Sequence, residues 1–147
     1  MRALVQRVVS ASVTVDNKLI SEIGSGLLVF LGIKADDTQS DRDYLIKKIL
    51  NLRIFSDQED KMNKSIVDIS GEMLLVSQFT LYGDCAKGNR PSFAKAMKPE
   101  QAKQCYDDFV QTLKQQYHAV KEGVFAAHMQ VALVNDGPVT ILIESKK

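Results

Sequence analysis

Short apolar runs and loose alternation of apolar with polar residues dominate the chain, and this pattern predicts mainly β-strands. Residues 3–15 are rich in valine and alternate loosely, and residues 18–23, which follow a turn signal, form the returning arm of a predicted hairpin. Residues 27–33 and 73–76 show no polar alternation at all. These two runs therefore predict central strands that are buried on both faces.

Two stretches have helical spacing instead. Residues 38–41 offer N-cap candidates for a first helix, and Asp41 suits the positive end of that helix. The predicted inner face of the first helix consists of Tyr44, Leu45, Ile49 and Leu52. A second helix is predicted to begin near Pro99, since proline is favoured in a first helical turn. Its apolar stripe comprises Ala102, Cys105, Tyr106, Phe109, Leu113 and Tyr117.

The remaining segments are shorter. Residues 53–55 are predicted to leave the first helix as a strand, and the polar residues 56–64 to form an exposed loop. Residues 129–134 and 139–143 predict two closing strands separated by a tight turn, and the last strand is expected at a sheet edge or a dimer seam. The order of the elements predicts an α/β fold of the α+β type, with two main helices in a single domain over residues 1–147.

Composition excludes several classes of protein. The net charge of +1 provides no overall attraction to nucleic acid, so such a partner would need a local basic patch. No apolar run approaches the ~18 residues that a membrane span needs, and charge interrupts the N-terminus too early for a signal peptide. Cys85 and Cys105 provide neither a disulfide framework nor a zinc set, and the acidic residues of segment 56–64 lack the register of a calcium loop. We therefore expect a cytoplasmic protein with no metal, no cofactor and no membrane partner.

The strand predicted at residues 73–76 runs directly into polar residues. Ser77, Gln78 and Thr80 follow it before a Gly-Asp pair breaks the strand. A buried strand that delivers hydroxyl and amide groups at its carboxyl end is where α/β architectures place ligands. The alternative, in which these hydroxyls satisfy nearby backbone groups, fits the same residues equally well. The segment therefore predicts a site without defining its chemistry.

A basic loop follows this candidate site. Residues 85–98 contain no acidic residue and four basic ones, Lys87, Arg90, Lys95 and Lys98. Contacts to phosphate hold and position nucleic acids, so the loop suits a polyphosphate or nucleic-acid substrate. A solvated loop that balances acidic residues elsewhere remains the alternative.

Two motifs of the chain resemble those of one enzyme family. The sequences SQFTLYGD at residues 77–84 and NDGPVT at residues 135–140 are similar to the motif pair of the D-aminoacyl-tRNA deacylases. The opening residues 1–8, the strand at residues 26–33 and the RPSF sequence at residues 90–93 also fit that family. The resemblance implies a mixed, curled β-sheet. It also implies hydrolysis of the ester that joins a D-amino acid to the terminal ribose of tRNA.

The resemblance further implies how L-amino acids are rejected. It implies a homodimer with active sites at the subunit interface, in which a cis Gly137–Pro138 bond projects into the partner's pocket. The carbonyl oxygens of Gly137 and Pro138 would clash with an L side chain, so glycyl-tRNA, which has no side chain, is an expected further substrate. Arg7, on the first strand, is a candidate brace for this motif.

The strand end at residues 77–80 would hold the reacting ester. Ester hydrolysis needs donors that face the developing oxyanion, and the backbone N–H groups of Phe79 and Thr80 are the candidates. Gln78 would position the substrate or a water molecule, and Ser77 completes the predicted catalytic set.

Three alternatives remain open from the residues. Thr80 could act as a covalent nucleophile, although a hydroxyl nucleophile normally needs a base nearby and the sequence shows none. Cys85 could form a hydrolase pair with His118 or His128. The third alternative is a dimeric nucleic-acid-binding module without hydrolase activity, which would use the basic residues of the loop at 85–98.

Overall fold

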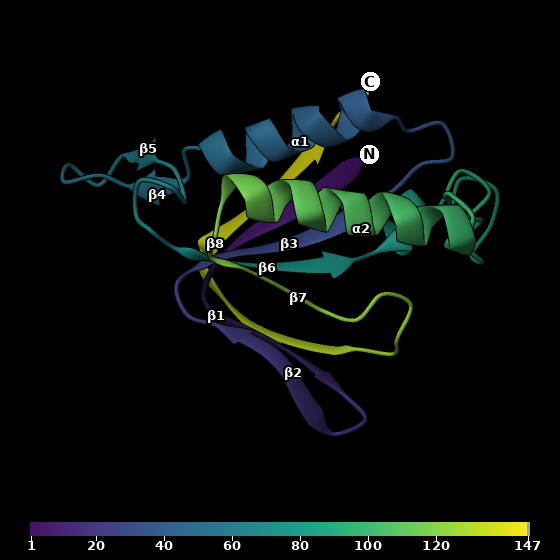
Figure 1. Cartoon of the computed structure of the whole chain (residues 1–147), viewed down its shortest axis with the longest axis horizontal. Coiled ribbons are helices and arrows are strands. Elements are labelled where there is room, and N and C mark those ends of the chain that lie inside the picture. The colour runs from purple at the N-terminus through teal and green to yellow at the C-terminus, as the bar shows by residue number, and fades with distance from the viewer. Residues whose placement is uncertain (147) are drawn as a thin grey trace.

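The long strand β1 (Arg2–Val15) organises the sheet in the computed structural model of this chain, which describes residues 1–146 (Figure 1). The other strands of this sheet are β2 (Lys18–Ile23), β3 (Gly26–Gly32), β6 (Glu72–Ser77), β7 (Val120–Glu122) and β8 (Gln130–Glu144). β2 and β3 pair antiparallel with one edge of β1, and β8 pairs antiparallel with the other edge. From β3 the sheet continues in parallel through β6 to β7.

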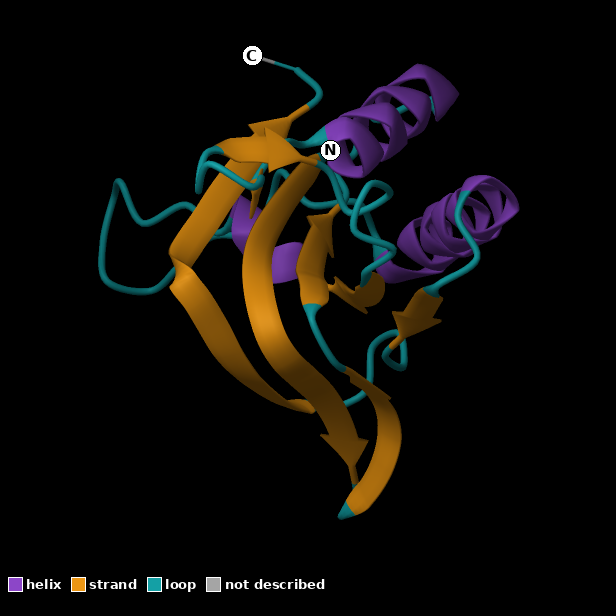
Figure 2. Ribbon diagram, turned by 90° about the vertical axis from the view of Figure 1, so that its left-hand side faces the viewer, coloured by secondary structure: helices purple, strands orange, loops and turns teal. Residues whose placement is uncertain are grey.

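The sheet curls strongly along β1, as Figure 2 shows. The Ser21 hydroxyl donates a hydrogen bond to the Glu122 carbonyl at 2.8 Å. Nearby, Lys121 Nζ donates to the Glu22 carbonyl at 2.7 Å. These bonds link β2 to β7, two strands that are not neighbours in the ladder, and so hold the curl nearly closed. The mixed, curled sheet with two main helices is thereby confirmed.

Helices α1 (Gln39–Asn51) and α2 (Pro99–Gln116) lie side by side over one face of the sheet (Figures 1 and 2). Leu27 and Val29 of β3 face the larger core beneath these helices, whereas Leu28 faces a second core inside the curl. Because β6 is covered in the same way, the two central strands predicted from unbroken apolar runs are confirmed. Over residues 1–146, no helix has the length and apolar character that crossing a membrane requires.

β8 shows that the prediction of two closing strands was wrong. It is one strand of 15 residues that pairs with β1, and the register of this pairing shifts at the Gly-Pro motif. Asn135 bridges the irregularity, because its side chain accepts from the Val139 N–H at 2.8 Å and donates to the Val139 carbonyl at 3.1 Å. The predicted tight turn is therefore a bulge inside a strand, a position that tolerates proline's missing N–H. The Gly137–Pro138 peptide bond is cis.

Three smaller elements also differ from the prediction. The side chain of Tyr44 is 44% exposed, because Leu45, Ile46, Ile49 and Leu50 already fill the buried face of α1. Segment 56–64 contains a two-stranded hairpin, in which β4 (Phe55–Ser56) pairs with β5 (Met62–Lys64). β7 was not predicted, because three residues are too few to show an alternation of apolar and polar residues.

The carboxylate of Asp41 fixes the start of α1. It is buried and accepts hydrogen bonds from the Thr38 N–H at 2.8 Å and the Thr38 hydroxyl at 3.0 Å. Lys146 Nζ lies 3.3 Å from the same carboxylate. Burial by itself raises the pKa of Asp41, but the hydrogen bonds outweigh this effect and hold the pKa well below its ordinary value of 3.8.

We expect Asp41→Asn to lower the free energy of unfolding by about 1–2 kcal/mol at neutral pH. Because the pKa of Asp41 is lower in the folded state, its contribution is complete above about pH 4 and is lost as the pH falls towards the folded pKa. The difference between the two proteins should therefore shrink in acid. Urea unfolding of both proteins at about pH 7 and about pH 3 measures it, and an undiminished difference at the lower pH would contradict this assignment.

Gly26 allows β3 and β6 to approach each other. A Cβ atom at Gly26 would lie 1.7 Å from the Glu72 carbonyl oxygen, whereas one at Gly24 would lie 3.5 Å from its nearest neighbour.

We expect Gly26→Ala to lower the free energy of unfolding by about 3 kcal/mol, because the paired backbones must move apart. Gly24→Ala is the matched control and should change this free energy by less than about 0.5 kcal/mol. Thermal unfolding compares them, and equal melting temperatures would refute the requirement for glycine.

Candidate functional site

The chain leaves β6 at Ser77 and turns at once into η1 (Phe79–Tyr82), a short 3₁₀ helix. Between the two elements, the Gln78 N–H donates to the Leu31 carbonyl at 2.8 Å and so ties the end of β6 to β3. Of the four residues predicted as catalytic, only Ser77 therefore lies in the strand. Ser77 and Gln78 are half-buried, and the next two residues are exposed.

The turn leaves two backbone donors at its start. The first hydrogen bond of η1 runs from the Leu81 N–H to the Gln78 carbonyl at 3.2 Å. The N–H groups of Phe79 and Thr80 precede this bond, and the leading N–H groups of a helical turn have no acceptor inside the turn. These are the two donors that the sequence motif indicated.

A pocket of about 570 Å³ opens beside this turn. Its walls are mostly apolar and include four alanines, Ala96, Ala102, Ala126 and Ala127. Its polar side chains are Ser77, Gln78, Lys98 and His128. No acidic residue lines the pocket in the part of the chain that the structure describes, so an anionic ligand would meet a cation there and no carboxylate.

The Thr80 side chain lies beside the pocket and is not part of its lining. The Gln78 side-chain amide donates a hydrogen bond to the Thr80 hydroxyl oxygen. Within residues 1–146 this hydroxyl has no hydrogen bond to a histidine, a carboxylate or an amine. The geometry supplies no base that would activate Thr80 as a nucleophile.

The proposed cysteine–histidine pair is not assembled either. Cys85 is exposed and does not line the pocket, and no hydrogen bond between described residues joins it to a histidine. His118 lies beyond the end of α2, next to the ring of Tyr117. His128 does line the pocket, on the segment between β7 and β8.

The four basic residues of the loop at 85–98 occupy different places. Lys98 lines the pocket, whereas Lys87 and Arg90 are exposed near the tip of the loop. Lys95 lies 3.6 Å from the Asp84 carboxylate. A hydrogen bond from the Ala86 N–H, together with the charge of Lys95, holds the pKa of Asp84 below its ordinary value. One of the four basic residues is thus part of an exposed ion pair within the chain.

Arg7 lies directly against the bulge that contains the Gly-Pro motif. Its Nε donates to the Asp136 carbonyl at 2.8 Å, and a terminal guanidinium nitrogen donates to the Ile54 carbonyl at 2.7 Å. Gly137 has a φ of +141°, and a Cβ atom there would lie 2.7 Å from the Val139 side chain. The bulge therefore requires glycine, and Arg7 holds the residue that precedes it.

The Gly-Pro motif does not reach the pocket of its own chain. Gly137 and Pro138 are exposed, and neither lines the pocket beside η1. Within one copy of the chain, the two motifs of the sequence therefore remain apart.

Apart from His128, which was considered as a partner for Cys85, sequence reasoning placed no residue of the segment at residues 125–129 in the site. This segment closes one side of the pocket, and Ala126 adopts a left-handed φ of +62° within it. Phe125 packs against Tyr106 of α2 with ring centroids 5.5 Å apart. Neither the apolar pattern nor a turn signal marks this arrangement, because it depends on packing against a helix distant in sequence.

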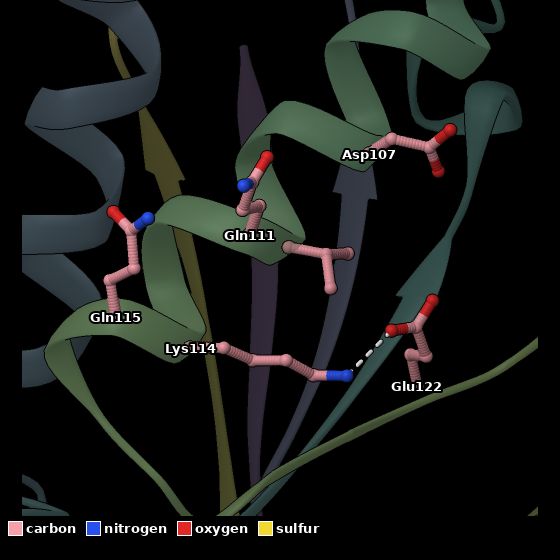
Figure 3. A pocket seen from close by; sticks show the side chains of 6 residues that line it. Asp107, Gln111, Lys114, Gln115 and Glu122 are labelled. Carbon is pink, nitrogen blue, oxygen red and sulfur yellow. Dashed lines mark hydrogen bonds and ion pairs between the residues drawn. The ribbon is translucent and has the colours of Figure 1, made fainter.

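A second hollow of about 510 Å³ lies between α2 and β7 (Figure 3). Lys114 forms an ion pair with Glu122 across it at 2.9 Å, and Asp107 pairs with Lys103 at 2.7 Å. It shares no residue with the pocket beside η1. Since each of its charged side chains is already in an ion pair, this hollow carries no candidate chemistry.

Comparisons with known proteins give consistent matches. A family model described as D-Tyr-tRNA(Tyr) deacylase matches residues 4–144. The D-aminoacyl-tRNA deacylase of Clostridioides difficile (strain 630) is 60% identical over 147 residues, which cover 100% of this chain and 99% of that protein. The D-aminoacyl-tRNA deacylase of Thermosipho africanus (strain TCF52B) is 55% identical, with the same coverage.

Two solved structures share the fold. The c-Myc DNA Unwinding Element Binding Protein is 49% identical and superimposes with a TM-score of 0.96, covering 100% of both chains. A probable eukaryotic D-amino acid tRNA deacylase is 16% identical, with a TM-score of 0.86 and coverage of 97% of this chain and 98% of that one. At that identity, the second match supports the fold alone.

Proposed function

This chain belongs to the D-aminoacyl-tRNA deacylase family, and from that premise we propose that the pocket beside η1 binds the aminoacylated end of tRNA and accepts D-amino acids and glycine but not L-amino acids. The chain is a hydrolase that deacylates D-aminoacyl-tRNA, as its 60% identical relative is described. The observation that carries the proposal is the position of the pocket. It is a largely apolar cavity with no carboxylate among its described lining residues, and Phe79, which carries the first leading N–H group of η1, lines it.

In the proposed reaction, backbone groups stabilise the transition state. The N–H groups of Phe79 and Thr80 donate to the oxyanion that forms at the ester carbonyl, and such donors contribute ~2.7–4 kcal/mol each. Ser77 and Gln78 border the pocket and position the ester or a water molecule. Water, assisted by the 2′-hydroxyl of the terminal ribose, attacks the ester, so no covalent intermediate is required.

Thr80 serves this reaction through its backbone N–H group, from a position beside the pocket. Its hydroxyl oxygen already accepts a hydrogen bond from Gln78, which leaves the hydroxyl hydrogen free to donate outward. A nucleophilic role would require the opposite arrangement, in which a base accepts that hydrogen.

We further propose a homodimer in which each Gly-Pro motif enters the pocket of the partner subunit. This arrangement is supported by the separation of Gly137 and Pro138 from the pocket of their own chain. β8, which carries the motif, has no fully buried residue and pairs with β1 alone among the described strands. On this strand Val134 is 56% exposed and Leu142 is 51% exposed, as expected of a surface that a second copy covers.

The proposed rejection of L-substrates depends on the positions of two backbone carbonyl groups, those of Gly137 and Pro138. If the carbonyls of Gly137 and Pro138 fill the space that an L side chain needs, the pocket excludes L-amino acids without recognising any D side chain. Arg7 keeps this part of β8 in place through the Asp136 carbonyl. Such exclusion has no effect on glycine, so glycyl-tRNA is also a substrate.

The basic residues Lys87, Arg90, Lys95 and Lys98 bind the tRNA backbone in this proposal. Lys98 borders the pocket and is placed nearest to the terminal nucleotide, and the exposed Lys87 and Arg90 reach phosphates farther along the strand. A tRNA substrate also places the activity in the cytoplasm.

A second candidate function is nucleic-acid binding without hydrolysis. It is favoured by the 49% identity to a structure described as a DNA-unwinding-element binding protein. The basic loop would serve that function equally well. A deacylation assay separates the two candidates, because a binding module would retain the tRNA with its ester intact.

We expect purified protein to release the amino acid from D-tyrosyl-tRNA and from glycyl-tRNA at comparable single-turnover rates. Release from L-tyrosyl-tRNA should be slower by about two orders of magnitude or more, the factor that ~3 kcal/mol of steric exclusion produces. Glycyl-tRNA as resistant as L-tyrosyl-tRNA would mean that the pocket recognises a D side chain directly. Binding of all three without release would favour the second candidate function.

Arg7→Lys should weaken the discrimination between D- and L-tyrosyl-tRNA roughly tenfold, since an ammonium cannot bridge both carbonyls and a lost charge-assisted hydrogen bond costs ~1.5–3 kcal/mol. The same single-turnover rates measure this effect.

Arg53→Lys is the matched control for that prediction. Arg53 binds the Asn63 carbonyl at 3.1 Å and the Asn63 side-chain oxygen at 2.6 Å, on the hairpin next to the bulge. This variant should leave the discrimination unchanged. An equal effect of the two substitutions would contradict the proposal that Arg7 holds the Gly-Pro motif in place.

A further inference from the structure

Two phenylalanine rings lie exposed at the pocket. Phe79 of η1 is 58% exposed, and Phe93 of the following loop is 36% exposed. Their ring centroids are 5.0 Å apart, and the ring planes cross at 71°. Both residues line the pocket. An edge-to-face pair uses the edge of one ring and a face of the other, so flat aromatic surface remains open to solvent.

The surroundings of this pair are cationic. Lys98 lines the same pocket, and Arg90 is exposed three residues before Phe93. Asp84, which directly precedes the loop, is paired with Lys95. Exposed aromatic rings beside basic side chains are the arrangement with which proteins bind single-stranded nucleic acid, because bases stack on the rings while the cations hold phosphates.

The size of the pocket indicates which base would stack. A volume of about 570 Å³ lies within the range of a site for one small molecule, so it can enclose one terminal nucleoside with its amino acid. The nucleotide that precedes it must then lie outside the enclosed volume, where Phe79 and Phe93 are exposed.

We propose that Phe79 and Phe93 form a stacking platform for the nucleobase that precedes the terminal nucleoside, on the unpaired 3′ end of the RNA. This inference rests on the proposed function, in which the pocket holds the terminal aminoacyl-nucleoside. It assigns to the side chain of Phe79 a role separate from that of its backbone N–H group. The platform recognises an unstacked base as a flat surface and does not read the sequence.

The test compares two substrates that differ only in the nucleotides beyond the pocket. D-tyrosyl-tRNA carries the preceding bases, and D-tyrosyl-adenosine, esterified at the ribose, does not. In wild-type protein the platform should make the KM for D-tyrosyl-tRNA lower than the KM for D-tyrosyl-adenosine. Phe93→Leu should lower the ratio of kcat/KM for D-tyrosyl-tRNA to that for D-tyrosyl-adenosine roughly tenfold, as expected when one base loses its aromatic surface. Phe93→Tyr, which retains a ring, should restore the ratio.

Phe125→Leu is the control for a general change in the pocket. Phe125 lines the pocket but packs against Tyr106 and is only half exposed. Its substitution should affect both substrates by a similar factor and leave the ratio unchanged. Size-exclusion chromatography of every variant reports whether the assembly state persists.

Four outcomes would overturn the inference. A ratio that Phe93→Leu leaves unchanged would show that no base uses the ring. If neither Phe93→Tyr nor another aromatic residue restored the ratio, the two rings would be only a structural contact. A change of assembly state in Phe93→Leu would lead to the same conclusion. If wild-type protein cleaved neither substrate, the proposed function would fail instead. In that case the affinity for uncharged tRNA tests the platform, and equal affinity of wild type and Phe93→Leu would overturn it as well.

Discussion

The parallel pairing of β3 with β6 is the constraint on which the site depends. The register runs from Gly26 opposite Glu72 to Leu31 opposite Ser77, and the Gln78 N–H continues it by donating to the Leu31 carbonyl. A slip of one residue would exchange the two faces of β6 and expose side chains that now fill both cores. The register therefore fixes the point at which the backbone leaves the sheet and turns into η1. The pocket and its two leading N–H groups follow from that point.

A single strand connects the two halves of the proposed catalytic apparatus. β1 pairs with β3 on one edge and with β8 on the other, so the pocket and the Gly-Pro bulge are both placed relative to it. Between the pairs Gln6–Thr140 and Val8–Asn135, Arg7 is the one residue of β1 that faces the bulge. Its guanidinium donates a hydrogen bond to the Asp136 carbonyl beside this shift of register. In the proposed homodimer, recognition between subunits thus depends on the pairing of strands within one subunit.

The sequence predicted those parts of the fold that local pattern determines. Central strands were recognisable because apolar residues on both faces leave no alternation, and α2 because its stripe is long. The closing strands were misjudged, because pairing with β1, which is distant in sequence, and the side chain of Asn135 convert a local turn signal into a bulge. Tyr44 was placed inside because spacing alone does not tell which side of a stripe meets the core. Ser77 and Gln78, which line the pocket, were indicated by the polar end of a buried strand. The wall at residues 125–129 instead depends on contacts with α2 that no local signal reports.

The alanines of the pocket restrict how this cavity can change during evolution. Ala96, Ala102, Ala126 and Ala127 border it from three separate segments of the chain. Every replacement except glycine adds atoms at these positions, so random substitution narrows the cavity far more often than it widens it. Descendants of this chain can readily acquire preference for smaller ligands. A larger ligand would require the backbone itself to move, which the two packed cores oppose.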